Sequence, residues 1–163
     1  MKFRKISDIY FVGIGGIGMS GIAELLHNLN FNISGSDMSD NENVKRLRKL
    51  GINITIGHSK NNIKAEVDVM VYSSAIPKDN PELVYAKNRK IPTIRRAEML
   101  GELISVKETS IAVGGTHGKT TTSSMVGTIL SHAKMDPTLV VGCLLYTSPS
   151  PRDLSTSRMP SSA

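Results

Sequence analysis

The residue types best suited to phosphate chemistry stand together in the segment 111–122. A short apolar run, Ile111–Val113, predicts a buried strand, and two glycines follow it. After Gly118-Lys119-Thr120, apolar residues recur at helical spacing as far as Ala133. A strand, a glycine turn and a helix start can together turn backbone N–H groups and a helix N-terminus toward an anion. The segment therefore predicts a loop that binds the phosphates of a nucleoside triphosphate.

Two side chains of this loop have defined roles in such a site. The amino group of Lys119 would reach the terminal phosphates, and the hydroxyl of Thr120 would ligate Mg²⁺. The spacing departs from the general pattern G-x-x-x-x-G-K-[ST], because Val113 stands where the first glycine is expected. A chance Gly-Lys-Thr in a surface turn is the alternative, and the strand and helix expected on either side argue against it.

A second glycine-rich turn lies near the start of the chain. Asp8–Val12 predicts a strand that leads into Gly13–Gly18, a match to G-x-G-x-x-G, and helical spacing follows. A further strand is expected at 31–35, and Asp37 then lies 19 residues past Gly18, where a dinucleotide-binding fold places its ribose-binding acid. The unit predicts a diphosphate at the helix N-terminus, with NAD as the default nucleotide. A glycine turn that only lets the helix pack on the strand is the alternative.

The rest of the chain predicts alternating strands and helices, and hence an α/β fold with a parallel sheet. Strands are expected at 53–56, 67–72, 91–94 and 138–142, and helices at 41–50, 80–88 and from 95 onward. Pro92 indicates an edge strand. Ser73 and Ser74 follow the most apolar strand, where open α/β sheets bind ligands, although a simple turn would look the same. His58 follows another strand and is either a solvated loop residue or a ligand contact.

The composition narrows the class of protein. Hydrophobic residues make up 39% and charged residues 21% of the 163 residues, which is typical of a soluble globular chain. The net charge of +6 is scattered, and only 4% of residues are aromatic, so the excess suits small anions better than nucleic acid. The single cysteine, Cys143, excludes an internal disulfide framework. No signal peptide or long apolar run is found, and we expect a cytoplasmic protein with no membrane partner.

Taken in order, these motifs resemble those of the Mur ligases. The matching segments are 13–24, 35–37, 73–76, 80–82, 95–100 and 115–122, within the span 6–142. The form Gly-Thr-His-Gly-Lys-Thr-Thr at 115–121 is specific to that family, and it explains the departure from the general phosphate-loop spacing.

The resemblance implies an ATP-dependent ligase of peptidoglycan precursor synthesis. Its substrates would be UDP-N-acetylmuramate and L-alanine, with the muramoyl carboxylate activated as an acyl phosphate that the amine attacks. The implied UDP-binding residues are Gly15, Gly16, Ile17, Gly18, Met19, Ser36, Asp37, Ser73 and Ser74. The implied ATP-binding residues are Gly115, Thr116, Gly118, Lys119, Thr120 and Thr121. Thr120 would ligate Mg²⁺, and the catalytic residues would be Lys119, Thr120 and His117, although His117 could equally serve only to fix the shape of the loop.

The domain organisation follows from the same pattern. We expect a complete Rossmann-like UDP-sugar-binding domain at 1–107, the start of a P-loop ATPase domain at 108–142, and a disordered Ser-, Thr- and Pro-rich tail at 143–163. Family members continue past residue 142 with further ATPase strands and a third domain. We therefore expect a truncated chain joined to unrelated sequence and inactive alone. An NAD-dependent oxidoreductase and a non-catalytic nucleotide-binding fragment remain the alternatives.

Overall fold

The computed structural model describes residues 6–106, 109–141 and 144–147, and the chain divides into two compact units, 1–111 and 112–163. The first unit is built on a five-stranded parallel sheet of order β3-β2-β1-β4-β5. The strands are β1 (Asp8–Val12), β2 (Asn32–Asp37), β3 (Asn53–Ile56), β4 (Val69–Tyr72) and β5 (Thr93–Arg95). The helices are α1 (Ile17–Asn28), α2 (Glu42–Lys49), α3 (Pro81–Asn88) and α4 (Arg96–Val106), with a short 3₁₀ turn, η1 (Lys60–Asn62). This is the α/β parallel-sheet fold that the sequence predicts, with β5 at the edge.

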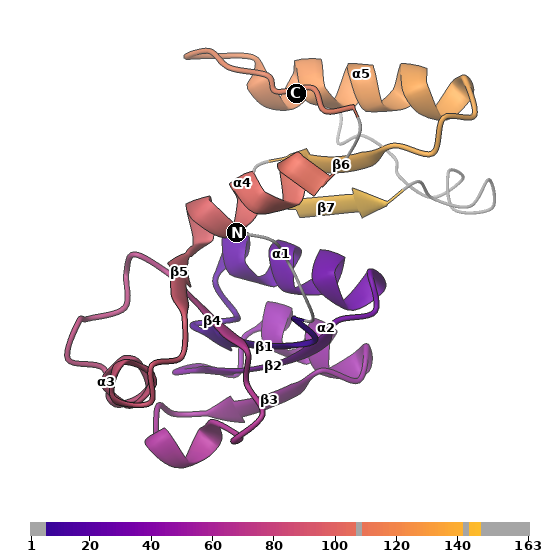
Figure 1. Ribbon diagram of the computed structural model, residues 1–163. Coiled ribbons are helices and arrows are strands. Elements are labelled where there is room, and N and C mark those ends of the chain that lie inside the picture. Colours follow the sequence, from indigo (N-terminus) through magenta and orange to yellow (C-terminus); the bar gives the residue numbers. More distant parts are fainter. Residues whose placement is uncertain (1–5, 107–108, 142–143, 148–163) are drawn as a thin grey trace, which may run out of the picture. The chain divides into compact units, whose positions relative to one another are not determined.

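Helices cover both faces of this sheet (Figure 1). Alternate residues of β1 point to opposite faces, as the period of a strand requires. Ile9 and Phe11 pack in the core beneath α1, α2 and α4, whereas Tyr10 and Val12 pack beside Ala86 of α3. The order of the strands reverses between β1 and β4, so the carboxyl ends of these two strands border the crevice in which such sheets bind ligands.

Two asparagine caps explain why α2 and α3 begin where the sequence predicts. The Asn41 side chain accepts a hydrogen bond from the amide of Val44 at 3.0 Å, and Asn80 accepts one from the amide of Glu82 at 2.9 Å. Each cap satisfies a backbone N–H group that has no partner inside its own helix. Pro81 stands in the first turn of α3, where its missing N–H group costs nothing.

The second unit contains α5 (Lys119–His132) and an antiparallel pair, β6 (Thr138–Val141) and β7 (Leu144–Thr147). The strand predicted at Ile111–Val113 is wrong: this segment has no regular structure, and Ile111 is 62% exposed. A strand needs a neighbour with which to exchange hydrogen bonds, and the described partners of β6 and β7 are each other.

The end of the chain also differs in part from the expectation of a disordered tail. Leu144–Thr147 forms β7, whereas the remaining residues of the predicted tail, 143 and 148–163, lie outside the described residues, as does the predicted boundary at 107–108. Within the part of the chain that the structure describes, no helix is long and apolar enough to cross a membrane.

Candidate nucleotide-binding site

The loop between β1 and α1 is anchored to the end of β2. The amides of Gly13 and Ile14 both donate to the carbonyl oxygen of Ser36, at 2.9 and 3.0 Å. Gly13 has a φ of 78°, a left-handed conformation that glycine adopts without strain. The turn therefore crosses the carboxyl end of the sheet in one defined conformation.

Asp37 and two asparagines hold Gly15 in the middle of this loop. The amide of Gly15 donates to Asp37 Oδ2 at 2.8 Å, and its carbonyl oxygen accepts from Asn41 Nδ2 at 3.2 Å and Asn43 Nδ2 at 3.0 Å. A Cβ at Gly15 would stand 2.9 Å from Asp37 Oδ2 and 2.7 Å from Val44 Cγ2, so any larger residue would displace these side chains. Close packing therefore explains the glycine at this position of the loop, whether or not a ligand also requires it.

The Asp37 carboxylate is engaged within the chain. The side chain is only 8% exposed, and while Oδ2 accepts from Gly15, Oδ1 accepts from the amide of Ser39 at 3.0 Å. The structure thus shows Asp37 positioning the glycine loop, and its contact with a ribose stays a prediction.

The start of α1 leaves backbone donors open. The amides of Met19 and Ser20 donate to the carbonyl oxygen of Gly16, at 3.0 and 2.9 Å, whereas those of Ile17 and Gly18 have no acceptor among the described residues. Ile17 is 65% exposed. Met19, also predicted to face the nucleotide, is buried in the core. The open amides and the helix dipole make this end of α1 suited to an anion.

An arginine that the sequence analysis left without a role lies beside these amides. A Cβ built at Gly18 would stand 3.0 Å from Arg96 Cζ, so the Arg96 guanidinium covers the backbone of Gly18. Arg96 is the first residue of α4 and belongs to the predicted Arg95-Arg96 motif. Its position adds a second positive group to the N-terminus of α1, because α4 follows β5 at the same edge of the sheet.

The predicted serines lie on the other side of the loop. A Cβ at Gly13 would be 3.9 Å from Ser73 Cβ, which places Ser73 beside the glycine turn where the strand order reverses. The Ser73 hydroxyl accepts from the amide of Ala75 at 3.3 Å, and Ser74 is exposed. The structure therefore brings Gly13–Gly18, Ser36, Asp37 and Ser73 together at one edge of the sheet.

A buried cluster of hydrogen bonds around one carboxylate lies beneath this edge, and the sequence analysis did not predict it. Glu82, in the first turn of α3, is fully buried, and its two carboxylate oxygens have five hydrogen-bond partners. The partners are Tyr10 Oη at 2.9 Å, Ser36 Oγ at 2.6 Å, His58 Nδ1 at 3.0 Å, the amide of Ser59 at 3.2 Å and Asn62 Nδ2 at 2.8 Å. A buried carboxylate needs hydrogen-bond partners of this kind, because water cannot reach it to solvate its charge. The cluster ties β1, β2, η1 and α3 together.

The Tyr10 hydroxyl within this cluster predicts sensitivity to alkali. Burial raises the pKa of Tyr10 well above its usual value, and the Glu82 carboxylate adds to the rise. A group whose pKa is raised on folding contributes stability below its unfolded pKa of about 10, and this contribution is lost as the pH rises further. We expect the free energy of unfolding to fall from about pH 8 to about pH 11, and less steeply in Tyr10→Phe. Urea titrations at both pH values measure this, and an equal fall in Tyr10→Phe and wild type would contradict it. Tyr85→Phe is the control.

The second glycine loop is open to solvent. Residues 114–122 are all exposed, Gly118 has a φ of 77°, and α5 begins at Lys119. Lys119 Nζ donates to the carbonyl oxygens of Gly115 and of Thr116, the latter at 3.2 Å. The predicted residues Gly115, Thr116, His117, Gly118, Lys119, Thr120 and Thr121 therefore lie together on one exposed loop and helix start. Such a loop fits a triphosphate, because its backbone donors and its threonine hydroxyls are accessible.

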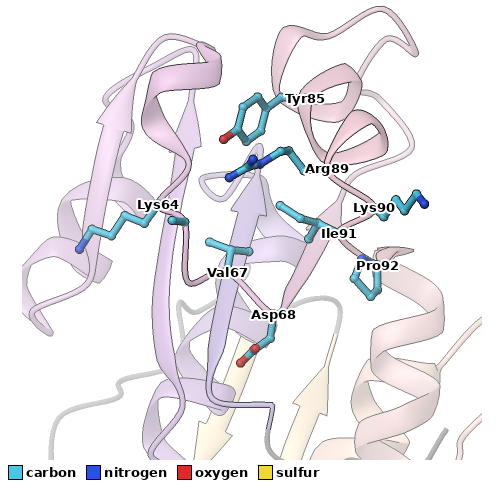
Figure 2. Close-up of a pocket in the computed structure, with 9 residues that line it drawn as sticks. Lys64, Val67, Asp68, Tyr85, Arg89, Lys90, Ile91 and Pro92 are labelled. Atoms are coloured by element: carbon cyan, nitrogen blue, oxygen red, sulfur yellow. The ribbon is translucent and has the colours of Figure 1, made fainter.

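Two cavities of the first unit lie at the amino edge of the sheet, opposite the glycine loop. The larger, of about 350 Å³, is lined by residues that include Val67, Asp68, Tyr85 and Arg89. Figure 2 shows the Arg89 guanidinium near the Tyr85 ring, 5.9 Å from its centre, and the Lys64 amino group pointing away. No predicted site residue lines either this cavity or the smaller one. Among the described residues, no group of three His, Cys, Asp or Glu side chains could hold a metal ion.

The fold is an α/β unit of the doubly wound type, and its glycine loop lies where such sheets bind ligands. Comparison with known families goes further: the model of the Mur ligase family, catalytic domain, matches residues 8–108. The chain belongs to the Mur ligase family.

Individual relatives agree with this assignment. The chain is 58% identical over 140 residues to the UDP-N-acetylmuramate--L-alanine ligase of Rhodospirillum rubrum, covering 86% of this chain and 29% of that protein. It is 56% identical over 145 residues to the enzyme of the same name from Geobacter sulfurreducens, covering 89% and 31%. The crystal structure of UDP-N-acetylmuramate-alanine ligase MurC from Thermotoga maritima superposes with a TM-score of 0.76 at 38% identity, covering 83% of this chain and 31% of that one. The chain thus spans about 30% of the length of the relatives that it matches.

Proposed function

We propose that this chain carries the UDP-sugar-binding unit of a UDP-N-acetylmuramate:L-alanine ligase, together with the ATP-binding loop of that enzyme. The observation that supports it most directly is the glycine loop at the point where the strand order reverses. There the open amides of Ile17 and Gly18 lie beside the Arg96 guanidinium in a member of the Mur ligase family. A diphosphate is the anion that such a combination of donors suits.

The residues of the first unit would bind and orient the substrate. The N-terminus of α1 and Arg96 would hold the diphosphate, while Ser36 and Asp37 keep the loop in place from β2. Ser73, beside Gly13, would face the nucleotide from β4. This arrangement leaves the sugar and its carboxylate free to extend beyond the edge of the sheet.

The second loop would bind ATP and Mg²⁺. When bound, ATP supplies the phosphoryl group that activates the muramoyl carboxylate for attack by the amine of L-alanine. Lys119 would offset negative charge on the transferring group, and the Thr120 hydroxyl would ligate the metal ion. Lys119 Nζ would first leave the carbonyl oxygens of Gly115 and Thr116, to which it donates in the structure. The role of His117 and the inactivity of the isolated chain stay predictions.

Calorimetry of the 163-residue chain with UDP-N-acetylmuramate, UDP and NAD tests the proposal. We expect UDP-N-acetylmuramate and UDP to bind and NAD to bind far more weakly. Failure of both UDP ligands to bind would overturn the proposal. Preferential binding of NAD would revive the oxidoreductase, which membership of the Mur ligase family disfavours. A separate titration with ATP and Mg²⁺ tests the second loop.

Replacement of Arg96 by alanine should weaken UDP binding about tenfold, because a charge-assisted hydrogen bond to a phosphate contributes roughly 1.5–3 kcal/mol before solvent screening at an exposed site. Arg89→Ala removes the same charge at the opposite edge of the sheet and is the matched control. Calorimetry with UDP measures both variants. An equal loss of affinity in the two would show that only net charge matters and would contradict a direct contact.

A further inference from the structure

His58 lies at the same edge of the sheet as the glycine loop. It follows β3, and the preceding residue, Gly57, donates its amide to the carbonyl oxygen of Asp37 at 2.8 Å. The imidazole Nδ1 is 3.0 Å from Glu82 Oε2 and 2.9 Å from Ser36 Oγ. The ring is therefore fixed between β2 and α3 by groups that are themselves buried.

The partners of Nδ1 determine where the ring carries its proton. Ser36 Oγ donates to Glu82 Oε2 at 2.6 Å, so its oxygen is left as an acceptor toward the ring. Nδ1 thus faces two acceptors, a carboxylate oxygen and a hydroxyl oxygen, and it must be the donor. Neutral His58 then carries its proton on Nδ1, and Nε2 has a free lone pair.

This arrangement differs from a Ser-His-Glu catalytic triad. In a triad the carboxylate and the hydroxyl contact opposite nitrogens of the ring, so that the base can take the serine proton. Here Ser36 and Glu82 contact the same nitrogen, and the Ser36 hydroxyl donates its hydrogen bond to the carboxylate. The cluster therefore cannot activate Ser36 as a nucleophile, and its effect is to orient His58.

The other ring nitrogen is available to a ligand. Nε2 makes no hydrogen bond within the described residues, and the His58 side chain keeps 10% of its surface exposed. It lies at the carboxyl edge of β2 and β3, next to the residue that anchors the glycine loop. We propose that Glu82 is a positioning residue that holds His58 with its proton on Nδ1, so that Nε2 accepts a hydrogen bond from a donor group of the bound nucleotide. The proposal rests on the UDP site described above. The donor is the 2′-hydroxyl or the 3′-hydroxyl of the ribose or the N3–H group of uracil, the three hydrogen-bond donors of the uridine part of UDP.

We expect a single substitution to change which ring nitrogen of His58 carries the proton. In Glu82→Gln, the amide oxygen must take the place of Oε1, because Ser59 N and Asn62 Nδ2 both donate there and Asn62 also donates to the Gly57 carbonyl oxygen. The amide NH₂ group then takes the place of Oε2 and donates toward His58 Nδ1. The ring must move its proton to Nε2, which turns the ligand-facing nitrogen from an acceptor into a donor.

Nitrogen-15 NMR of the histidine rings in the ligand-free 163-residue chain reads the protonated nitrogen directly, at a pH where His58 is neutral. We expect Nδ1–H in the wild type and Nε2–H in Glu82→Gln. Tyr10→Phe removes a donor to Oε1 alone and should keep Nδ1–H. A wild-type ring with its proton on Nε2, or an unchanged ring in Glu82→Gln, would overturn the positioning role. This readout does not depend on nucleotide binding, so its failure is distinct from a failure of the proposed function.

Calorimetry then tests the contact with the nucleotide. We expect UDP to bind Glu82→Gln about three- to tenfold more weakly than wild type, the cost of one hydrogen bond, and Tyr10→Phe unchanged. With the wild-type chain, UDP, its 2′-deoxy and 3′-deoxy forms and its N3-methyl form identify the donor without any protein variant. A three- to tenfold loss with one analogue supports the proposal. Equal affinity for all four would overturn it, and so would equal affinity of wild type and Glu82→Gln for UDP.

Discussion

Replacement of Gly35 by alanine should destabilise the parallel-sheet unit by about 3 kcal/mol, a large fraction of the free energy of unfolding of an ordinary domain. Gly35 lies in β2, an interior strand between β3 and β1, opposite Phe11 of β1. A Cβ at this position would stand 2.5 Å from the Phe11 carbonyl oxygen, 3.1 Å from Phe11 Cβ and 3.0 Å from Ile14 Cδ1.

The cost is high because the nearest atom belongs to the backbone. A flexible side chain can rotate away from an added methyl group, but the Phe11 carbonyl is held in place by the neighbouring strands. Ile14 begins the glycine loop, so relief by moving Ile14 would disturb the candidate site as well. We therefore expect UDP affinity to fall together with stability.

Urea unfolding followed by circular dichroism measures the change, with Gly101→Ala as the control. Gly101 lies in α4 with open space around its Cβ position, and alanine favours helix over glycine by about 1 kcal/mol. We expect Gly101→Ala to unfold at the same or higher urea concentration than wild type. If Gly35→Ala matched that behaviour, the close approach of β1 and β2 would be incorrect.

Most of the first unit could be predicted from the sequence because its signals are local. The pattern of Asn53–Ile56 gave the bounds of β3 without error, and the Asn80-Pro81 pair located the start of α3 through its cap and its fixed φ. The first glycine turn was equally readable, since it combines a strand before it with helical spacing after it. The patterns that indicate these strands, turns and helices are each contained within a short stretch of sequence.

The errors lie where structure depends on distant partners. Ile111–Val113 has the apolar composition of a strand, but a strand forms only beside another, and composition does not reveal the partner. Leu144–Thr147 shows the converse, because pairing with β6 makes a strand of residues expected to be disordered. Whether a strand forms is decided by pairing, which the spacing of residues does not encode.

The buried part of the candidate site was missed for a similar reason. Glu82 reads from the sequence as an acidic residue in the first turn of a helix, a position usually exposed. Its partners Tyr10, Ser36 and His58 lie 72, 46 and 24 residues away, and none of them signals a carboxylate. Arg96 likewise reaches Gly18 only through the fold. Sequence reasoning located the glycine loop with Ser36 and Asp37, and it missed Glu82 and Arg96, which reach this region only through the fold.

Replacement of Glu82 by methionine should cost about 3 kcal/mol of stability and abolish tight UDP binding. Methionine fills similar space but accepts no strong hydrogen bond, so buried donors that include the Tyr10 hydroxyl, the Ser36 hydroxyl and the Ser59 amide would lose their acceptor. Ser36 also anchors the glycine loop through its carbonyl oxygen, so its displacement would loosen the nucleotide site.

Glu42→Met is the matched control for this substitution. Glu42 lies at the start of α2, is fully exposed and pairs with Lys45 at 2.9 Å, an ion pair that solvent screens. We expect no measurable change in its urea midpoint or its affinity for UDP. Glu82→Met should shift both, and Glu82→Gln, which keeps an acceptor for the Oε1 donors, should lie between Glu82→Met and wild type in stability. If Glu82→Met unfolded at the wild-type midpoint, the carboxylate would not be what holds β1, β2 and α3 together, and the orientation of His58 would need another cause.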